Sequence, residues 1–353
     1  MDSVASKKQL FVFYLLPEFT LLAFSSAIEA LRLANMVLGF EAYRWRLASH
    51  DGGEVCASSG VPIRTESSVA AERQAASRQG RPSMVVVCGG LNIQNHSSKT
   101  LESWLRECRQ NKIAIAGLCT GAHVLAQARL LNDKKCVIHW ENVPSFVERF
   151  GSTSVRTGLF AIDGNIHTCA GGAAAFDMML HIIRRDFGED VVTGVCERAI
   201  VDRMRNSDDR QRLPFSPRVE EHHPALTKLI ERMQETLAEP VSVDELMADL
   251  GLTRRQVERL FRNALRNSPA RYYMKLRLER ARLLLQQTST PIVEVAFASG
   301  FSSASHFSKA YRDAYGCSPH EVRKVNRTLF PNAEIALGSD LYRLSETAVA
   351  YQS

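Results

Sequence analysis

Two segments near the C-terminal end of the chain repeat one another at an offset of about 50 residues. The first reads VDELMADLGLTRRQVERLFRNALRNSPA and the second VEVAFASGFSSASHFSKAYRDAYGCSPH. Each predicts an amphipathic helix, a turn led by Gly251 or Gly300, a second helix ending near Phe261 or Tyr311, and a closing Ser-Pro. This is the helix-turn-helix layout, in which the second helix enters the major groove of DNA. Between the two units, ARYYMKLRLERARLLLQQ predicts one long helix that sets their spacing.

The positive charge of the chain is confined to the same region. Residues 225–330 contain 17 Lys and Arg against 11 Asp and Glu, whereas the rest of the chain contains 27 of each, so this third carries the whole net charge of +6. Within 254–282 there are ten basic residues against two acidic ones. Such an excess neutralises phosphates whatever the base sequence, and it is typical of a nucleic-acid-binding module attached to a neutral domain.

The spacing of apolar residues predicts which side chains of each second helix are buried. The expected buried stripes are Val257, Leu260, Phe261 and Ala264 in the first helix, and Phe307, Ala310 and Tyr311 in the second. The side chains that face outward, and that we predict to bind DNA, are Arg254, Arg255, Glu258, Arg259, Arg262, Ser305, His306, Lys309 and Arg312. Arginine can contact guanine with two hydrogen bonds, and glutamate can accept one from cytosine.

The stretch ARYYMKLRLERARLLL, followed by PIVEVAFASGFSSASHFSKAYRDAYGCSPHEVR, resembles the AraC/XylS family of bacterial transcription regulators over about residues 225–327. The resemblance implies two helix-turn-helix units that read successive major grooves on one face of promoter DNA, and it implies RNA polymerase as a partner. Aligned on the aromatic anchors, the base-facing residues would be Arg255, Glu258, Arg259, Ser305, His306 and Lys309. The second unit has one extra residue between its glycine and its anchor.

Residues 9–205 show a different pattern, in which apolar strands alternate with amphipathic helices. Strands are expected at 9–16, 43–50, 83–90, 112–118 and 134–140, and helices at 21–39, 98–111, 120–131, 141–151, 173–184 and 188–205. A hairpin is expected to turn at Asp163-Gly164. Strands that alternate with helices indicate a parallel-sheet α/β sandwich of the flavodoxin-like type.

The predicted organisation is therefore a sensor domain over 1–205, a linker over 206–224, the all-α DNA-binding domain over 225–327 and a tail over 328–353. The eight cysteines are scattered, with no CxxC pair and no zinc spacing, so we expect no metal and no cofactor, and a reducing cytoplasm. The longest apolar runs, such as LFVFYLLP, are shorter than the roughly 20 residues that span a bilayer, so we expect no membrane association.

The stretch AIAGLCTGAHVLAQA, residues 114–128, is an apolar strand that enters Gly-x-Cys-x-Gly and leaves as a helix. Small residues on both sides of Cys119 suit the tight, strained turn on which enzymes expose a nucleophile. The helix N-terminus favours a thiolate, but it equally favours a bound oxyanion or ligand carboxylate. If the cysteine were catalytic, His139 or His123 would be its candidate base and Glu29 its candidate acid.

This half resembles the PfpI/ThiJ (class I glutamine amidotransferase-like) superfamily over about residues 9–200. The shared features are the VVVCGG strand, the cysteine turn, a strand ending in HW, and TCAGGAAAFDMMLHII. Its fusion to AraC-type helices is similar to the GlxA-type regulators. Within those, LLPEFTLLAFSSAIEALRLAN and IHWENVPSFVERF resemble regulators of arginine, carnitine, and choline and glycine betaine catabolism.

The chain departs from the enzymes of that superfamily. Amidotransferases carry a His-Pro-Glu far downstream of the cysteine, whereas here His139-Trp140-Glu141 follows after only about twenty residues. Many peptidase-like relatives carry a histidine directly after the nucleophile, where this chain has Thr120. A complete triad is not evident, so we predict that the chain is not an enzyme.

We expect instead a ligand pocket where the carboxyl ends of the strands meet. Its predicted walls are Glu29, Gly89, Gly90, Cys119, Thr120, His139, Trp140 and Gly171. Trp140 with a nearby carboxylate would hold a quaternary ammonium group by cation–π contact, although it is equally well a core aromatic residue.

The predicted function is that of a cytoplasmic, homodimeric transcription regulator, an activator of a catabolic operon. Its expected effector is a small metabolite such as glycine betaine, carnitine or arginine. The alternatives are a Cys-dependent hydrolase or glyoxalase-type enzyme with a DNA-binding appendage, a redox sensor acting through Cys119, and a purely structural dimerisation platform.

Overall fold

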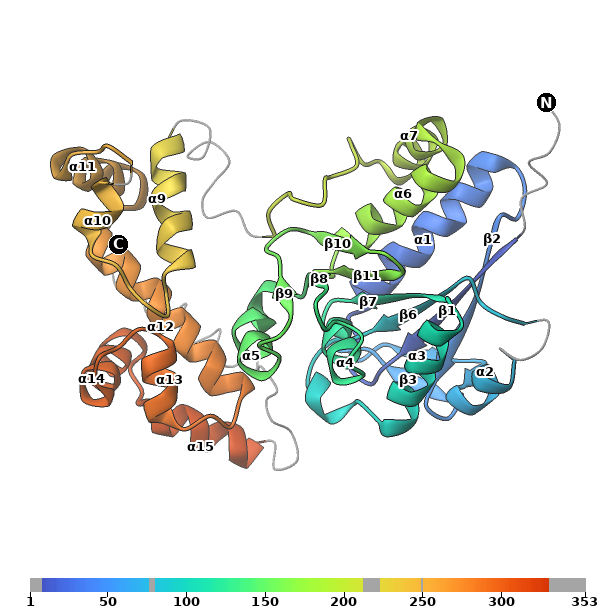
Figure 1. Ribbon diagram of the computed structural model, residues 1–353, viewed down its shortest axis with the longest axis horizontal. Helices are drawn as coiled ribbons and strands as arrows, with labels where there is room; N and C mark the ends of the chain where they lie inside the picture. Colours follow the sequence, from blue (N-terminus) through green and yellow to red (C-terminus); the bar gives the residue numbers. More distant parts are fainter. Residues whose placement is uncertain (1–7, 76–79, 212–222, 249, 330–353) are drawn as a thin grey trace. The chain divides into compact units, whose positions relative to one another are not determined.

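The computed structural model describes residues 8–75, 80–211, 223–248 and 250–329. The chain divides into two compact units, Met1–Gln211 and Arg212–Ser353, which are described separately below (Figure 1). The predicted linker and tail lie largely in 212–222 and 330–353, outside the described residues.

A seven-stranded sheet in the order β10-β11-β7-β6-β1-β2-β5 forms the centre of the first unit. Its strands are β1 (Gln9–Leu15), β2 (Tyr43–Ser49), β5 (Ser67–Ser68), β6 (Met84–Cys88), β7 (Ala114–Leu118), β10 (Phe160–Asp163) and β11 (Ile166–Cys169). All neighbours are parallel except β10 and β11, which pair as the antiparallel hairpin predicted at Asp163-Gly164. The α/β fold class is thus confirmed, with one antiparallel strand at an edge.

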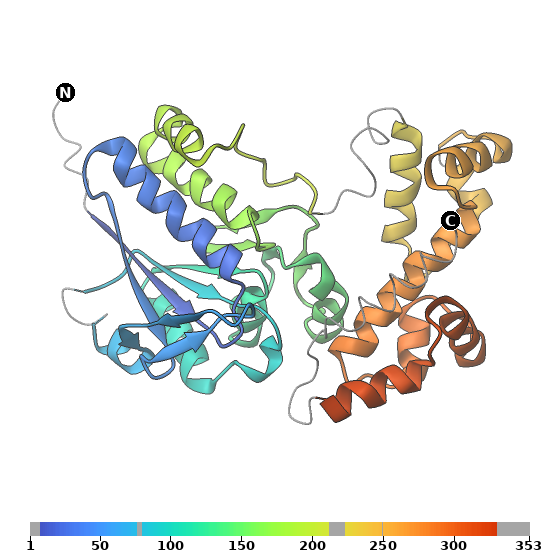
Figure 2. The same cartoon turned by 180° about the vertical axis from the view of Figure 1, so that it is seen from behind.

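Helices cover both faces of this sheet (Figures 1 and 2). The helices are α1 (Leu21–Leu38), α2 (Val69–Ala75), α3 (Lys99–Gln110), α4 (Gly121–Gln127), α5 (Val143–Arg149), α6 (Ala174–Phe187) and α7 (Glu189–Ala199). Alternate residues of β1 point to opposite sides, as a period of two requires. Phe11 and Phe13 pack with α1, α6 and α7, whereas Val12 and Tyr14 pack with α3 and α4. Two hydrophobic cores therefore enclose the sheet.

Helix α1 is long and apolar enough to cross a membrane by length and composition, with a mean hydropathy of 1.5 over 18 residues. Seven of its residues, Ala27 and Leu31 among them, are buried, and the helix contributes to the core beneath α6 and α7. We therefore interpret α1 as a core helix. Gly39, at a φ of +74°, ends it in the left-handed conformation that favours glycine.

The sequence misplaced one strand in this unit and overextended two helices, since α4 ends at Gln127 rather than near 131. The stretch 134–140 does not join the main sheet: only β8 (Lys135–Cys136) is a strand, and it pairs with β9 (Ser154–Val155). The place beside β7 is taken by β11. Helix α7 ends at Ala199 rather than near 205, because Ile200 at a φ of +55° leaves the helical conformation.

Some short elements were not expected at all. The strands β3 (Glu54–Cys56) and β4 (Pro62–Arg64) form a small antiparallel sheet of their own. The short turns η1 (Ile93–Asn95) and η2 (Trp140–Asn142) are 3₁₀ helices. None of these carries a periodicity that sequence alone would reveal.

The second unit is helical throughout its described residues, which confirms the predicted all-α domain. Its helices are α9 (Pro224–Glu235), α10 (Val243–Ala248), α11 (Arg254–Leu265), α12 (Pro269–Gln287), α13 (Ile292–Ala298), α14 (Ala304–Tyr315) and α15 (Pro319–Leu329). Helices α10 and α11 form the first helix-turn-helix and α13 and α14 the second, joined by the long α12. The two recognition helices, α11 and α14, have equal lengths and correspond at an offset of 50 residues.

Hydroxyl side chains fix where the helices of this unit begin. Thr253 and Gln256 form a capping box at the start of α11, and the Ser303 hydroxyl accepts from the His306 backbone at the start of α14. Ser268 caps α12 in the same way. The extra residue of the second unit lies between Gly300 and Ser303, so it lengthens the turn and leaves the recognition helix in register with its counterpart.

Candidate ligand site and DNA interface

The turn between β7 and α4 has the tight geometry that the sequence predicted. Cys119 adopts a φ of +57°, in the left-handed region that costs a non-glycine residue about 1–2 kcal/mol. Glycines allow other segments to approach it closely. A Cβ atom on Gly171 would lie 2.6 Å from the Cys119 Cβ, and one on Gly89 would lie 2.4 Å from the Gly121 nitrogen. Only glycine fits at these positions.

The Cys119 thiol is buried and engaged within the protein. Its exposed fraction is 6%, and the Thr20 hydroxyl donates to its Sγ at 3.4 Å. Burial raises the pKa of the thiol despite the hydrogen bonds from Thr20 and from the Thr120 backbone, and the charge of Glu141 raises it further. The thiol is therefore neutral at pH 7, whereas a nucleophile must be the thiolate.

The backbone donors around the turn are also engaged. The N–H groups of Cys119 and Gly171 both donate to the buried thiol of Cys169. The Thr120 hydroxyl donates to the carbonyl oxygen of Gly90 at 2.7 Å. A transition-state oxyanion needs free donors aimed at it. These three donors are already bound to the protein, so this part of the turn is built as a packed corner.

Neither candidate base contacts the cysteine. The ring of His123 packs against Phe150 and Phe146 at centroid distances of 5.0 and 6.4 Å, and its burial lowers its pKa to about 3. His139 lies 3.7 Å from Glu141 through its Nδ1, and burial lowers its pKa as well. The structure shows no hydrogen bond from either described histidine to Cys119, and therefore no assembled Cys-His pair.

Glu29 does not belong to this cluster, which corrects its predicted place in the pocket. It lies about 12 Å along α1 from the end that approaches Cys119, at eight residues of helical rise. Its side chain is half-exposed and binds the Arg32 guanidinium at 2.6 Å. Of the eight predicted pocket residues, Glu29 alone lines the cavity described next.

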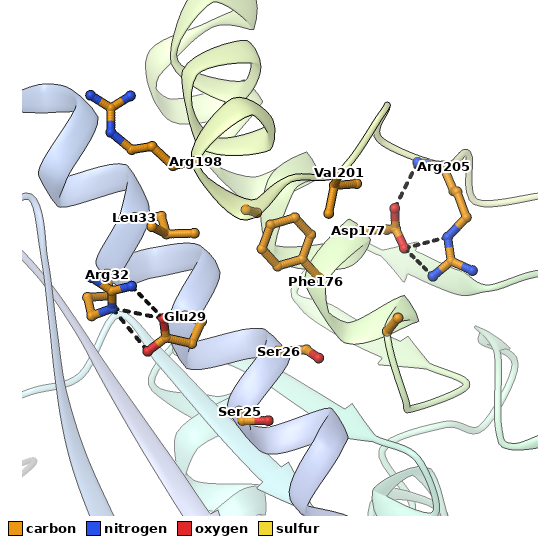
Figure 3. A pocket seen from close by; sticks show the side chains of 12 residues that line it. Ser25, Ser26, Glu29, Arg32, Leu33, Phe176, Asp177, Arg198, Val201 and Arg205 are labelled. Carbon is orange, nitrogen blue, oxygen red and sulfur yellow. Dashed lines mark hydrogen bonds and ion pairs between the residues drawn. The ribbon is translucent and has the colours of Figure 1, made fainter.

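That cavity, of about 540 Å³, lies between α1, α6 and the end of α7 (Figure 3). Glu29 and Ser26 come from α1, Phe176 and Asp177 from the first turns of α6, and Arg205 from the segment after α7. Sequence reasoning missed this place. The signal that could have found it is Asp177, an acid within the otherwise apolar run AAAFDMMLHII.

The predicted DNA-facing side chains are exposed on both recognition helices. In α11, Val257 and Phe261 are fully buried, and in α14 Phe307 and Tyr311 are. The exposed residues include every one predicted: Arg254, Arg255, Glu258, Arg259, Arg262, Ser305, His306, Lys309 and Arg312. At the offset of 50 residues, Arg259 of α11 corresponds to Lys309 of α14. Gln256 of α11, which is also exposed, corresponds to His306. Exposure makes these side chains available to DNA, and their contacts remain predictions.

Not all the arginines of 254–282 are available to phosphates. Arg277 donates to the carbonyl oxygens of Ser299 and Gly300, and its guanidinium lies 4.2 Å from the centre of the Phe301 ring. Arg280 donates to the carbonyl oxygen of Ala298 at 2.9 Å. Both hold the C-terminal end of α13 against α12, so part of the basic density is structural.

Comparison with known proteins matches both units. Residues 10–185 match the DJ-1/PfpI family, and residues 246–325 match a helix-turn-helix domain family. The HTH-type transcriptional regulator GbdR of Pseudomonas aeruginosa is 40% identical over 314 residues, which cover 88% of this chain and 83% of that protein. The chain belongs to the family of HTH-type transcriptional regulators that includes GbdR.

Two further HTH-type regulators agree. The HTH-type transcriptional regulator CdhR of Pseudomonas aeruginosa is 36% identical, over 89% of this chain and 91% of its own. The regulator GlxA of Rhizobium meliloti is 32% identical, over 88% and 94%. A solved AraC family regulator from Pseudomonas putida is 29% identical, covers 54% of this chain and 99% of its own, and has a TM-score of 0.48. Membership of this family supports the expectation that the chain is a regulator and not an enzyme.

Proposed function

We propose that this protein is a cytoplasmic, sequence-specific transcription regulator, an activator of a catabolic operon, whose first unit binds a small metabolite. The effector class is an amino acid or quaternary amine such as glycine betaine, carnitine or arginine. Two chains associate into a homodimer, and RNA polymerase is the partner at the promoter. The observation that carries this proposal is the pair of recognition helices, each with its predicted basic and polar side chains exposed.

The proposed function has two parts, DNA binding and ligand binding, and each unit supplies one of them. The second unit supplies base-reading side chains such as Arg259 and phosphate-binding charge. The first unit supplies a cavity of a size typical of small-molecule sites, which range from about 300 to 1,000 Å³. The glycine betaine and carnitine class follows from the resemblance of the first unit to regulators of those catabolic operons.

The DNA-binding part is tested by selecting duplexes from a randomised library with the full chain. The affinity for the selected sequence is then measured against a scrambled duplex across a range of salt concentrations. We expect the selected duplex to bind at least about 10³-fold more tightly, the lower end for specific regulators. Equal affinity for both duplexes at every salt concentration would refute sequence-specific recognition.

The alternative of a Cys-dependent hydrolase or glyoxalase-type enzyme has a sharp test in Cys119→Ala. A regulator that uses Cys119 only as a packed residue keeps its effector-dependent transcription in a reporter strain. A response that depends on turnover, or on oxidation of this thiol, disappears. The engaged donors and the neutral thiol favour the regulator.

A further inference from the structure

An ion pair between the buried Asp177 and the half-exposed Arg205 closes one end of the cavity between α1, α6 and α7 (Figure 3). The Asp177 carboxylate is 2% exposed. It accepts from the Arg205 side chain at 2.9 Å from Nε and 2.7 Å from Nη2, and from the Arg205 backbone nitrogen at 2.8 Å. Three hydrogen bonds to one residue fix both the position and the direction of the chain at Arg205.

Arg205 lies on the segment that leaves this unit toward the DNA-binding unit. Further along the same segment, the carbonyl oxygen of Ser207 accepts from the Leu159 nitrogen at 2.7 Å. Gln211 donates to the carbonyl oxygens of Ile138 and Gly158 at 3.1 and 2.9 Å. Residues 200–211, which we name the exit strap, are therefore attached to the α/β unit, and the first part of the predicted linker belongs to that unit.

The other charges of the cavity leave one cation for an incoming anion. Glu29 binds Arg32 and Asp177 binds Arg205. Arg198, an exposed residue of α7, also lines the cavity, and its guanidinium donates to the carbonyl oxygen of Gly194 at 3.2 Å. Within the described part of the chain, no carboxylate pairs with Arg198.

We propose that this cavity is the effector site and that its ligand is a small zwitterion carrying one carboxylate and one cationic group. The carboxylate binds Arg198, and the cationic group lies against the ring of Phe176, with the Glu29 carboxylate nearby. The effect of ligand binding reaches the DNA-binding unit through Arg205. This residue lines the cavity and begins the anchored part of the exit strap. The proposal rests on the metabolite-sensing function proposed above and names its site.

The chemistry of the lining selects this ligand class. A purely cationic ligand leaves Arg198 without a counterion and adds a like charge to a lining with three arginines and two acids. A simple anion satisfies Arg198 but makes no use of Phe176. A zwitterion satisfies both. Glycine betaine and carnitine present one carboxylate and one quaternary ammonium group within the length of a small molecule, whereas arginine adds a second cationic group.

The test is titration calorimetry of the full chain with glycine betaine, carnitine and arginine, with choline as the probe that lacks a carboxylate. We expect one of the zwitterions to bind and choline to bind far more weakly. Arg198→Gln should weaken that binding about 10- to 100-fold, the range for removing one charge-assisted hydrogen bond. The exposed neighbour Glu197→Gln, which does not line the cavity, is the matched control and should leave the affinity unchanged.

A second pair of variants separates the site from the signal. Ala173→Trp, at an exposed lining position, fills the cavity and should abolish binding. Gln211→Ala removes the two hydrogen bonds of the exit strap to Ile138 and Gly158 and lies outside the lining. It should keep ligand binding within a few-fold, while the affinity for the selected DNA no longer changes when ligand is added. Arg203→Gln, also on the exit strap and outside the lining, should keep the ligand response.

The outcomes distinguish the site from the function. If a zwitterion binds, and both Arg198→Gln and Ala173→Trp bind it with wild-type affinity, the proposed location of the site is refuted. The proposed metabolite sensing is then retained, with its site elsewhere in the first unit. If no zwitterion binds while the selected DNA is still recognised, sensing of this ligand class is wrong and so is the site. If Arg198→Gln instead halves the molecular mass in solution with unchanged ligand affinity, the cavity is an interface between chains and the proposal fails.

Discussion

Two buried histidines should make the first unit sensitive to mild acid. Burial, with a smaller contribution from the charge of the nearby Arg149 and against a hydrogen bond with Gln127, lowers the pKa of His123 to about 3. Burial likewise lowers the pKa of His167 to about 4, with smaller contributions from the charges of Arg185 and His181. Both rings are at most 8% exposed, so solvent screens these effects little.

The sign and the size of the effect follow from linkage. An unfolded histidine has a pKa near 6.5. Below that pH the unfolded chain therefore binds protons that the buried rings of the folded chain do not bind. The stabilising contribution is complete above about pH 6.5 and is lost as the pH falls toward 4 and 3. At pH 5, which is 1.5 pH units below the pKa of an unfolded histidine, each ring lowers the free energy of unfolding by about 2 kcal/mol, at about 1.36 kcal/mol per unit. The two together cost about 4 kcal/mol.

The assay can use the intact protein because its tryptophans report on one unit only. Trp45, Trp104 and Trp140 all lie in the first unit, and they are the three of the whole chain. Urea denaturation followed by tryptophan fluorescence at pH 8 and pH 5 therefore gives the free energy of unfolding of that unit. We expect this free energy to be at least about 4 kcal/mol lower at pH 5.

Variants attribute the loss to these rings. His123→Phe and His167→Gln should each reduce the difference between pH 8 and pH 5 by about 2 kcal/mol, whatever they do to stability at pH 8. The exposed His50→Gln is the matched control and should keep the wild-type difference. A remaining loss in the double variant is expected from His139 and His181, whose pKa values burial also lowers. A double variant that keeps the full wild-type difference between pH 8 and pH 5 would refute the reasoning.

Three further predictions concern single positions. Arg259→Ala should weaken binding of the selected duplex by about 1–3 kcal/mol in fluorescence anisotropy, and an equal loss on scrambled DNA would instead assign Arg259 to phosphate. Gly171→Ala should destabilise the first unit by about 2–4 kcal/mol in urea denaturation, because its φ is +89° and the new Cβ would lie 2.6 Å from the Cys119 Cβ; a stable variant would contradict the close packing. Arg277→Met should destabilise the second unit by about 1–3 kcal/mol in a circular dichroism melt, whereas Lys275→Met, exposed on the same helix, should not.

Sequence periodicity predicted the faces of the recognition helices because helical geometry alone determines them. Once Phe261 and Tyr311 are placed inside, a period of 3.6 puts Arg259 and Lys309 outside, and tertiary packing has no freedom to change this. The strained corner at Cys119 was predictable for a similar reason, since Gly-x-Cys-x-Gly between a strand and a helix leaves few backbone paths.

What lies opposite a side chain could not be predicted in this way. Glu29 is an acid on an apolar helix, but its distance from Cys119 depends on how far α1 runs beyond the sheet edge. The run 134–140 is apolar enough for a central strand, yet β11 occupies that place in the sheet. The count of basic residues near α12 overstated the charge available to DNA, because Arg277 and Arg280 hold α13. Each of these errors concerns a partner distant in sequence.

The corner at Cys119 and the proposed effector site are joined by one short loop. Gly171 packs on Cys119 while Ala173, two residues on, lines the cavity at the start of α6. Catalysis at the corner would need a thiolate and free donors, but burial keeps the thiol neutral and the donors bind sulfur atoms. The same packing fixes the loop that ends at Ala173. If that side of the cavity is fixed, ligand binding acts on Arg205 at the other side instead of displacing the loop. Under the proposed sensing function, the enzyme-like corner contributes by fixing the position of α6.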